Sequence, residues 1–196
     1  AFHEAADEMG KKETFKGYGP EQGYDFLKDA IAGYYAERGV QLASDEIFIS
    51  DGAKSDLGNI LDLFSEDNTV LVPDPVYPVY VDTNVMAGRK IIYMNATAEN
   101  GFLPMPDESV KADIIYICSP NNPTGRVFTR EELTELSQFI IKHDLICVCD
   151  QAFEDTAFPG HEMVTMASLP GMWERTVTVC SCSKGMALSG YRVGYI

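Results

Sequence analysis

Basic residues are scarce in this sequence, which has 15 lysines and arginines against 30 aspartates and glutamates among its 196 residues. The formal net charge is therefore −15 at pH 7. Nucleic acids and anionic membrane surfaces carry charge of the same sign and would repel such a chain. The composition thus argues against both as partners. A basic helix-turn-helix segment, which would indicate a transcription regulator, is also missing.

Long apolar runs are absent as well. None approaches the roughly 20 residues that a membrane-spanning helix needs, and no signal-peptide pattern opens the chain. We therefore expect no membrane partner and a cytoplasmic location. A hydrophobic content of 45% is typical of a globular protein, and a chain of 196 residues can bury one good core.

Cysteines and histidines are too few and too poorly spaced for a metal site. Four of the five cysteines form two C-x-C pairs, at positions 147 and 149 and at positions 180 and 182. A tetrahedral metal site needs further cysteine or histidine ligands at suitable spacing, and neither pair has them nearby. We expect no metal and interpret the cysteines as core residues of a protein in a reducing compartment.

The sequence does contain a regular alternation of helix-like and strand-like segments. We expect helices at residues 1–12, 23–38, 53–64, 77–86 and 129–143. We expect strands at residues 46–50, 69–73, 90–94, 113–118, 145–150 and 175–180, and a further strand beginning within residues 191–196. This order predicts an α/β fold, a three-layer sandwich whose mostly parallel sheet is covered by helices on both faces. No linker or repeat interrupts it, which favours one domain at residues 1–196.

In such a sheet, ligands bind beyond the carboxyl ends of the strands. After the strand at residues 46–50, Gly52, Ala53 and Lys54 open a helix, where exposed backbone N–H groups attract an anion. A plain helix cap by Asp51 is the alternative. Tyr77 follows the next strand among prolines, which would hold its ring against a flat ligand, and core packing of that ring is the alternative.

Two later strands are followed by an amide and a carboxylate. Asn122 lies in a rigid Asn-Pro-Thr-Gly turn, and its amide can form a hydrogen bond with a ligand oxygen. Asp150 ends its strand, where a carboxylate either pairs with a buried cation or caps a loop.

The last sixteen residues contain Lys184, three residues after Ser181, and Arg192 among glycines. A lysine that ends a strand in a cleft is a candidate for Schiff-base chemistry, because partial burial and a neighbouring cation would lower its pKa. For this stretch alone, a solvated loop lysine is the competing interpretation.

Together these motifs resemble those of the fold-type I, pyridoxal-phosphate-dependent aminotransferases of class I/II. Four anchors occur in the order of that family: Asn122 in N-P-T-G, Asp150, Lys184 in S-x-x-K and Arg192 in G-x-R-x-G. The resemblance implies the large, cofactor-binding domain of that fold, with pyridoxal 5′-phosphate as the cofactor. Since enzymes of the family are considerably longer, it also implies a fragment that lacks most of the small domain and that has weak or no activity alone.

The resemblance assigns a role to each anchor. Lys184 would hold the cofactor through a Schiff base and then act as the base that moves the substrate's α-proton. Asp150 would keep the pyridine nitrogen protonated, which preserves the ring as an electron sink. Asn122 would bond the phenolic oxygen, and Tyr77 would stack on the ring. The remaining cofactor-binding residues, chiefly at the phosphate, would be Gly52, Ala53, Lys54, Ser181 and Arg192.

Tyr18 matches a tyrosine that reaches the phosphate of the neighbouring subunit, so the resemblance implies a homodimer with shared active sites. Residues 13–24, 50–56 and 74–88 look like a narrower group, the LL-diaminopimelate aminotransferases. These act on LL-diaminopimelate and tetrahydrodipicolinate, with glutamate and 2-oxoglutarate as the partner pair, in lysine and cell-wall biosynthesis. Glu21 and Lys54 would then contact the distal end of the substrate, and solvated surface charges are the alternative.

Two features depart from these patterns. Phe153 stands where the family usually has tyrosine, which removes one hydrogen bond to the phenolic oxygen of the cofactor. Residues 150–155 and 184–195 look more like general aminotransferases, so the substrate assignment depends on the amino-terminal half. Another fold-type I enzyme, such as a broad-specificity aminotransferase or a C–S β-lyase, is the alternative. A nicotinamide-binding domain would need G-x-G-x-x-G after its first strand, which this chain lacks.

Overall fold

The computed structural model describes residues 1–196 and is built around one seven-stranded sheet with the order β1-β7-β6-β5-β4-β2-β3. The strands are β1 (Ile49–Ser50), β2 (Thr69–Asp74), β3 (Lys90–Asn95), β4 (Ile114–Cys118), β5 (Ile146–Asp150), β6 (Thr176–Ser181) and β7 (Gly194–Tyr195). Neighbours from β3 to β6 pair in parallel, whereas β7 is antiparallel to both β6 and β1. The expected mostly parallel α/β sheet is confirmed.

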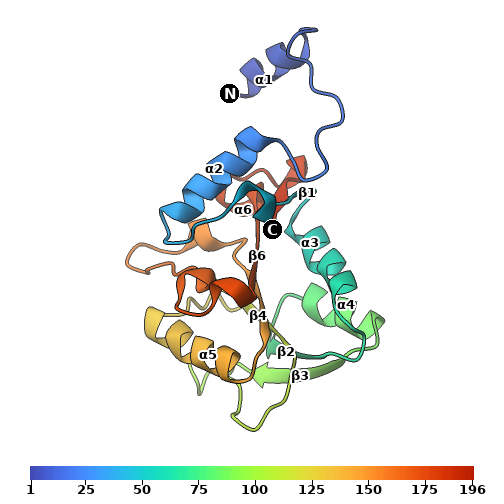
Figure 1. The fold of residues 1–196 in the computed structure, drawn as a ribbon. Coiled ribbons are helices and arrows are strands. Elements are labelled where there is room, and N and C mark those ends of the chain that lie inside the picture. The colour runs from blue at the N-terminus through green and yellow to red at the C-terminus, as the bar shows by residue number, and fades with distance from the viewer.

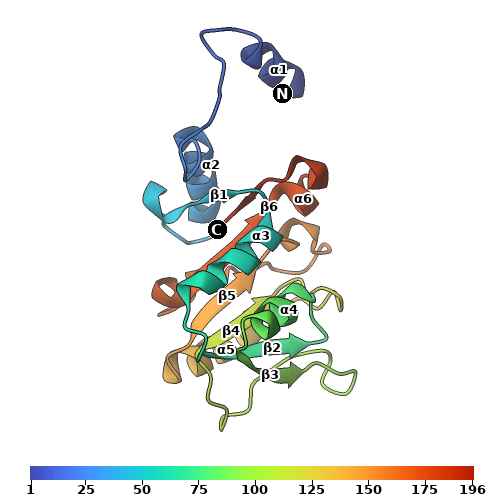
Figure 2. The same cartoon turned by 90° about the vertical axis from the view of Figure 1, so that its right-hand side faces the viewer.

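Helices cover both faces of this sheet, as Figures 1 and 2 show. They are α1 (Phe2–Met9), α2 (Asp25–Ala36), α3 (Ala53–Asn59), α4 (Val79–Met86), α5 (Arg130–Lys142) and α6 (Cys182–Gly185). Helices α3 and α4 lie on one face and α5 lies on the other. The expected three-layer sandwich is therefore confirmed. None of the helices is both long enough and apolar enough to cross a membrane.

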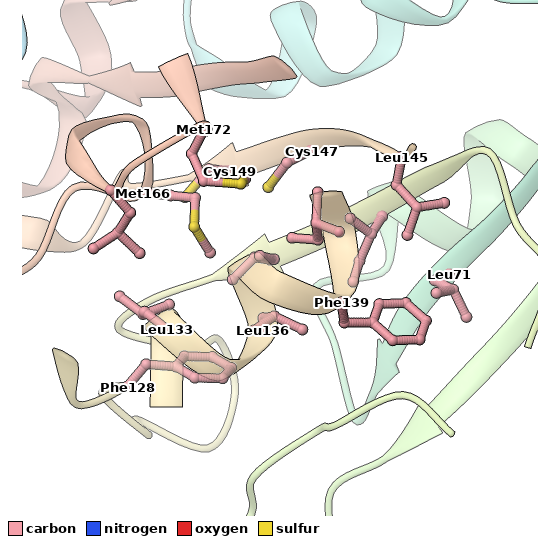
Figure 3. Close-up of a cluster of buried hydrophobic side chains, with 14 of the residues drawn as sticks. Leu71, Phe128, Leu133, Leu136, Phe139, Leu145, Cys147, Cys149, Met166 and Met172 are labelled. Atoms are coloured by element: carbon pink, nitrogen blue, oxygen red, sulfur yellow. The ribbon is translucent and has the colours of Figure 1, made fainter. Parts of the chain in front are cut away.

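Strand β4 is apolar throughout because its two faces enter two different cores. Ile115 and Ile117 pack into the core beneath α5, whereas Ile114 and Tyr116 pack into the core beneath α3 and α4. Figure 3 shows the first core, in which Leu136 and other apolar side chains of α5 face the sheet. The cysteines at positions 147 and 149 are buried in this core as free thiols.

The ends of two expected elements differ from the sequence interpretation. The strand expected at residues 46–50 is only Ile49–Ser50, because Ser44–Glu46 form a 3-10 turn instead. The helix expected at residues 53–64 ends at Asn59 and continues as a 3-10 turn. The guanidinium of Arg89 then donates to the carbonyl oxygens of residues 61, 64 and 65, at 2.8, 2.7 and 3.0 Å, which satisfies the acceptors that this end leaves open.

The amino-terminal segment extends away from the sheet (Figures 1 and 2), and its Phe2 ring stacks on that of Tyr191 with centroids 5.2 Å apart. Its helix α1 matches the helix expected at residues 1–12, but none of its residues is buried. All of residues 1–21 are exposed. Helix α6, which contains Lys184, was not expected from the sequence.

Candidate active site

The carboxyl ends of β2, β4, β5 and β6 lie side by side, because the sheet order brings these strands together and they run in parallel. Cys118 is paired with Asp150, and Asp150 is paired with Val179 in the next strand. The segments that contain Tyr77 and Asn122 leave the sheet at this same edge. This edge is where ligands bind in sheets of this type.

Asp150 is the buried acid of this edge, with 5% of its surface exposed. Its Oδ1 accepts a hydrogen bond of 2.9 Å from the backbone N–H of Ala152, and its Oδ2 accepts one from the hydroxyl of Tyr80. Burial raises the pKa of the Asp150 carboxyl, while these two donors act in the opposite direction. Of the two alternatives given for Asp150, the structure contains the loop cap and no ion pair with a cationic side chain.

Three tyrosine rings pack together beside this acid. The ring of Tyr80 stacks on that of Tyr116, with centroids 5.0 Å apart and planes at 19°. The ring of Tyr77 meets Tyr80 edge-on, at 6.0 Å and 81°. Tyr77 is only half-buried and packs partly against the core under α3 and α4. Its ring therefore has both a core contact and an exposed part available to a ligand.

The turn into α3 forms a cradle of backbone groups. Ala53 and Lys54 begin the helix, so their N–H groups have no intrahelical acceptor, and no side chain caps them. The expected alternative, a cap by Asp51, is therefore wrong. Gly52 has a φ of 128°, and the guanidinium of Arg192 fills the space where its side chain would be.

Two further contacts hold this turn in place. The backbone N–H of Gly52 donates to Ser50 Oγ at 3.2 Å, and Ser50 Oγ donates to Asp56 Oδ2 at 2.6 Å. Burial raises the pKa of the Asp56 carboxyl. From the other side, Gly194 packs so closely that a Cβ there would lie 2.6 Å from the Cα of Gly52. The turn therefore has little freedom to move.

Lys184 lies in α6, three residues beyond the end of β6 at Ser181. The expectation that this lysine ends the strand is therefore wrong. Its side chain is exposed, which contradicts the expected partial burial. The Lys184 Nζ lies 5.0 Å from the centroid of the Phe153 ring, whereas Ser181, at the end of β6, is buried. The lysine is an accessible amine that faces an aromatic ring.

The loop after β4 is held by the first of its two asparagines. The amide of Asn121 donates to Thr124 Oγ1 at 2.8 Å and to the carbonyl oxygen of Pro75 at 3.5 Å. The second contact joins this loop to the one that contains Tyr77. The side-chain amide of Asn122 has no hydrogen-bond partner in the chain, so it remains available to a ligand.

The remaining predicted residues are on the surface. Tyr18 and Glu21 are exposed, and neither side chain forms a hydrogen bond or an ion pair within the chain. Lys54 is also exposed, next to the free N–H of Ala53. The structure thus brings Lys54 to the backbone cradle and leaves Tyr18 and Glu21 on the surface of the amino-terminal segment.

Sequence reasoning missed two kinds of supporting residue. Tyr80 was not singled out, although it lies only three residues after Tyr77, within the helix expected at residues 77–86. The pair of Tyr34 and Glu154 was also missed: the tyrosine hydroxyl donates to Glu154 Oε1 at 2.7 Å and joins α2 to the loop after β5. No cluster of three or more His, Cys, Asp or Glu side chains has a metal-binding arrangement.

The known proteins that resemble this chain in sequence and in structure all point to the same family. A family model described as aminotransferase class I and II matches residues 1–196. LL-diaminopimelate aminotransferases from Methanosphaera stadtmanae and Desulfosudis oleivorans are 46% and 45% identical over the whole chain. The chain covers 50% of each of these proteins, so it spans about half the length of the curated relatives it matches.

Two solved structures illustrate the similarity in fold. The L,L-diaminopimelate aminotransferase from Chlamydomonas reinhardtii has a TM-score of 0.85 and 41% sequence identity, with 98% of this chain and 50% of that one covered. The aromatic aminotransferase from Pyrococcus horikoshii has a TM-score of 0.90 and 30% identity, with 99% of this chain and 54% of that one covered.

Proposed function

The chain belongs to the class I and II aminotransferases, and from this premise we propose that it forms the cofactor-binding part of an enzyme that transfers an amino group between an amino acid and a 2-oxo acid. The family depends on pyridoxal 5′-phosphate, which supplies an electron sink for the bond that breaks at the substrate's α-carbon. In this proposal residues 1–196 are the large domain. The observation that carries it is a buried carboxylate, Asp150, at the ligand-binding edge of the sheet.

Three groups at this edge suit the ring of the cofactor. Asp150 keeps unused lone pairs on both carboxylate oxygens, and one of these oxygens would accept a hydrogen bond from the N–H of the protonated ring nitrogen. The free amide of Asn122 would donate to the phenolic oxygen. Tyr77 would cover one face of the ring with the exposed part of its own. A flat, singly charged heterocycle fits this set of donors and acceptors.

The backbone cradle suits the phosphate. The absence of a side chain at Gly52 lets the Arg192 guanidinium approach the turn, and the N–H groups that follow it are free to donate to phosphate oxygens. The guanidinium of Arg192 lies beside this turn and would neutralise part of the charge. The hydroxyl of the buried Ser181 would add a further donor.

The remaining chemistry belongs to Lys184. Its exposed primary amine would bind the cofactor covalently and would later carry the proton removed from the substrate's α-carbon at Nζ. Phe153 lies beneath this amine and offers no hydroxyl to the cofactor. The family's usual tyrosine at this position would supply one more hydrogen bond to the phenolic oxygen.

We propose LL-diaminopimelate as the amino donor and 2-oxoglutarate as the acceptor. The supporting observation is that relatives called LL-diaminopimelate aminotransferases are 42% to 46% identical across the whole chain. Glu21 and Lys54 would contact the distal amino and carboxylate groups of this substrate. Both side chains are exposed and unpaired, as residues that await a ligand would be.

We propose further that the enzyme is a homodimer in which each subunit contributes to the other's site. All of residues 1–21 are exposed in the single chain, which suits a segment that packs on a partner. Tyr18 would donate to the phosphate held by that partner. A cytoplasmic location would agree with the five free thiols.

Borohydride reduction tests the cofactor assignment. The native polypeptide that contains residues 1–196 is mixed with pyridoxal 5′-phosphate, reduced, digested and mapped by mass spectrometry. We expect the pyridoxyl label on Lys184, and a Lys184→Arg variant as control should remain unlabelled. A label on another residue, or none at saturating cofactor, would refute the assignment.

A panel of 2-oxo acids with LL-diaminopimelate as donor tests the substrate assignment. We expect turnover that depends on 2-oxoglutarate. With a cysteine S-conjugate in place of LL-diaminopimelate, release of a thiol, ammonia and pyruvate without a 2-oxo acid would instead indicate a C–S β-lyase and would contradict the proposal.

A further inference from the structure

Tyr80 reaches Asp150 from a different layer of the molecule. Its hydroxyl donates a hydrogen bond to Asp150 Oδ2, although the two residues are 70 positions apart in the sequence. Tyr80 lies in α4, on one face of the sheet, and Asp150 ends strand β5. Both are buried, with exposed fractions of 0% and 5%. Water therefore does not compete for this bond.

The ring of Tyr80 is held in place by its neighbours. It stacks on Tyr116 at 5.0 Å and meets the edge of Tyr77 at 6.0 Å. The backbone of Tyr80 is fixed as well, because the side-chain amide of Asn84 donates to its carbonyl oxygen at 2.8 Å. A ring enclosed on these sides keeps its hydroxyl oxygen close to the acid.

We propose that Tyr80 is a positioning residue. It would orient the carboxylate of Asp150 toward the ring nitrogen of the cofactor and keep that carboxylate ionised. This inference rests on the proposed function, since it presupposes that pyridoxal 5′-phosphate binds at this edge. Tyr80 does not touch the reacting atoms in this proposal. It acts only through the carboxylate.

The physical reason is the balance between two bases that share one proton. A buried carboxylate without donors is a strong base and would take the proton from the ring nitrogen. The hydroxyl of Tyr80 and the N–H of Ala152 stabilise its negative charge and make it a weaker base. The proton then stays on the ring. Because both donors are neutral, they bring no second cation to repel the protonated ring.

The test compares two phenylalanine variants of the native polypeptide. Tyr80→Phe removes the hydroxyl that reaches Asp150 and keeps the ring in the stack. Tyr116→Phe is the matched control, because it removes a buried hydroxyl from the same stack that does not bond to Asp150. The readouts are the dissociation constant of pyridoxal 5′-phosphate and the NMR chemical shift of its isotope-labelled ring nitrogen.

We expect Tyr80→Phe to weaken cofactor binding by roughly 10-fold, as the loss of a hydrogen bond to a charged group implies. We also expect the ring-nitrogen resonance to move toward that of unprotonated pyridine. Tyr116→Phe should change neither quantity. A ring-nitrogen shift that is identical in Tyr80→Phe and the unaltered protein would overturn the inference, even if the variant were less stable.

A second measurement tests the inference if the Tyr80→Phe variant does not fold. Monofluorotyrosine introduced at position 80 keeps both the ring and its hydroxyl. Its fluorine resonance should shift when the cofactor binds, because Asp150 then gains a cationic partner, whereas the same probe at position 116 should not respond. No response at position 80 would overturn the inference. Failure of the unaltered protein to bind the cofactor would instead refute the proposed function.

Discussion

At position 52 the backbone has a φ of 128° and a ψ of 150°, a conformation open almost only to glycine. The guanidinium of Arg192 fills the space that a side chain would need, and Gly194 closes the other side. Glycine is therefore required at position 52 for two reasons: the backbone conformation and the lack of space for a side chain. Only the first reason applies at position 88, since Gly88 has a φ of 76° but no atom lies within 4 Å of where a Cβ would be.

This difference leads to a prediction for two alanine variants. Gly52→Ala should lower the free energy of unfolding by about 1 to 3 kcal/mol and should also weaken binding of pyridoxal 5′-phosphate, because Arg192 must move. Gly88→Ala should cost only about 1 kcal/mol of backbone strain and should leave cofactor binding unchanged. Thermal unfolding and a cofactor titration measure both quantities. Equal cofactor binding by the two variants would contradict the role given to Gly52.

Glu154 is a second residue with an unusual environment. It is buried, with 6% of its surface exposed, and accepts hydrogen bonds from the Tyr34 hydroxyl at 2.7 Å and the Cys180 thiol at 3.4 Å. Burial raises the pKa of its carboxyl above the ordinary value of 4.5, and the hydrogen bonds only partly offset this. The folded state therefore holds the proton of Glu154 more tightly than the unfolded state does.

The sign of the pH dependence follows from that raised pKa. Below pH 4.5 the carboxyl is protonated in both states, so its contribution to stability is then fully present. That contribution is lost as the pH rises through the raised pKa. We expect Glu154→Gln to remove this loss, so that the stability of the unaltered protein relative to the variant falls as the pH rises. Urea unfolding at several pH values measures the difference, and Glu37→Gln, at an exposed position, is the control. Parallel profiles would rule out this role for Glu154.

The position of a single residue in the fold could be predicted from the sequence where a local pattern determines that position. Asp150 ends an apolar run, so its position at the edge of the sheet could be predicted. Its bond with Tyr80 could not, because the partner lies 70 positions away and only the fold brings it near. The exposure of Lys184 was missed for a related reason: a four-residue helix after β6 leaves no periodic signal.

The elements divide in the same way. Strand β4 and helix α5 were expected nearly as found, because an apolar run and a capping box are local signals. Strand β1 has two residues and is a strand only because Ile49 pairs with Tyr195, close to the other end of the chain. Such a pairing has no local sequence signature. The sequence therefore predicted a strand at residues 46–50 but not where this short strand begins, because its distant partner decides that.

The capping box of α5 gives a prediction at this scale. Thr129 Oγ1 accepts from the N–H of Glu132 at 3.2 Å, and Glu132 Oε2 accepts from the N–H of Thr129 at 2.8 Å. Thr129→Ala should therefore lower the free energy of unfolding by about 1 kcal/mol. Thr134→Ala, inside the same helix, removes only a bond to a carbonyl that the helix already uses and should cost under about 0.5 kcal/mol. Equal losses in urea unfolding would contradict the cap.

For the whole molecule, the order of motifs along the chain gave more information than any one of them. The resemblance to class I and II aminotransferases is confirmed by the family model over residues 1–196 and by relatives at 46% identity. The segments that contain Tyr77, Asn122, Asp150 and Lys184 meet because the parallel strands β2, β4, β5 and β6 end at one edge. The sequence could not predict the surroundings of the amino-terminal segment, since all of residues 1–21 are exposed in the single chain.

Tyr18 is the residue of that segment with the most specific expectation. Its side chain is fully exposed, and a tyrosine hydroxyl is a good donor to phosphate. If it completes the site of a partner subunit, Tyr18→Phe should weaken cofactor binding by roughly 10-fold. A residue that is merely solvated would show no such loss. The binding measurement alone does not tell whether the tyrosine acts within its own subunit.

Mixed dimers of the native polypeptide separate the two arrangements. When a Lys184→Ala subunit pairs with a Tyr18→Phe subunit, the second subunit keeps its lysine and receives an intact tyrosine from the first. One complete site then forms, and tight cofactor binding should return at that site. The control pairs an unaltered subunit with one that carries both substitutions. In this pair the only subunit that keeps Lys184 receives phenylalanine at position 18 from its partner, so cofactor binding should stay weak. Equal affinity in the two mixtures would mean that Tyr18 does not serve the partner's site.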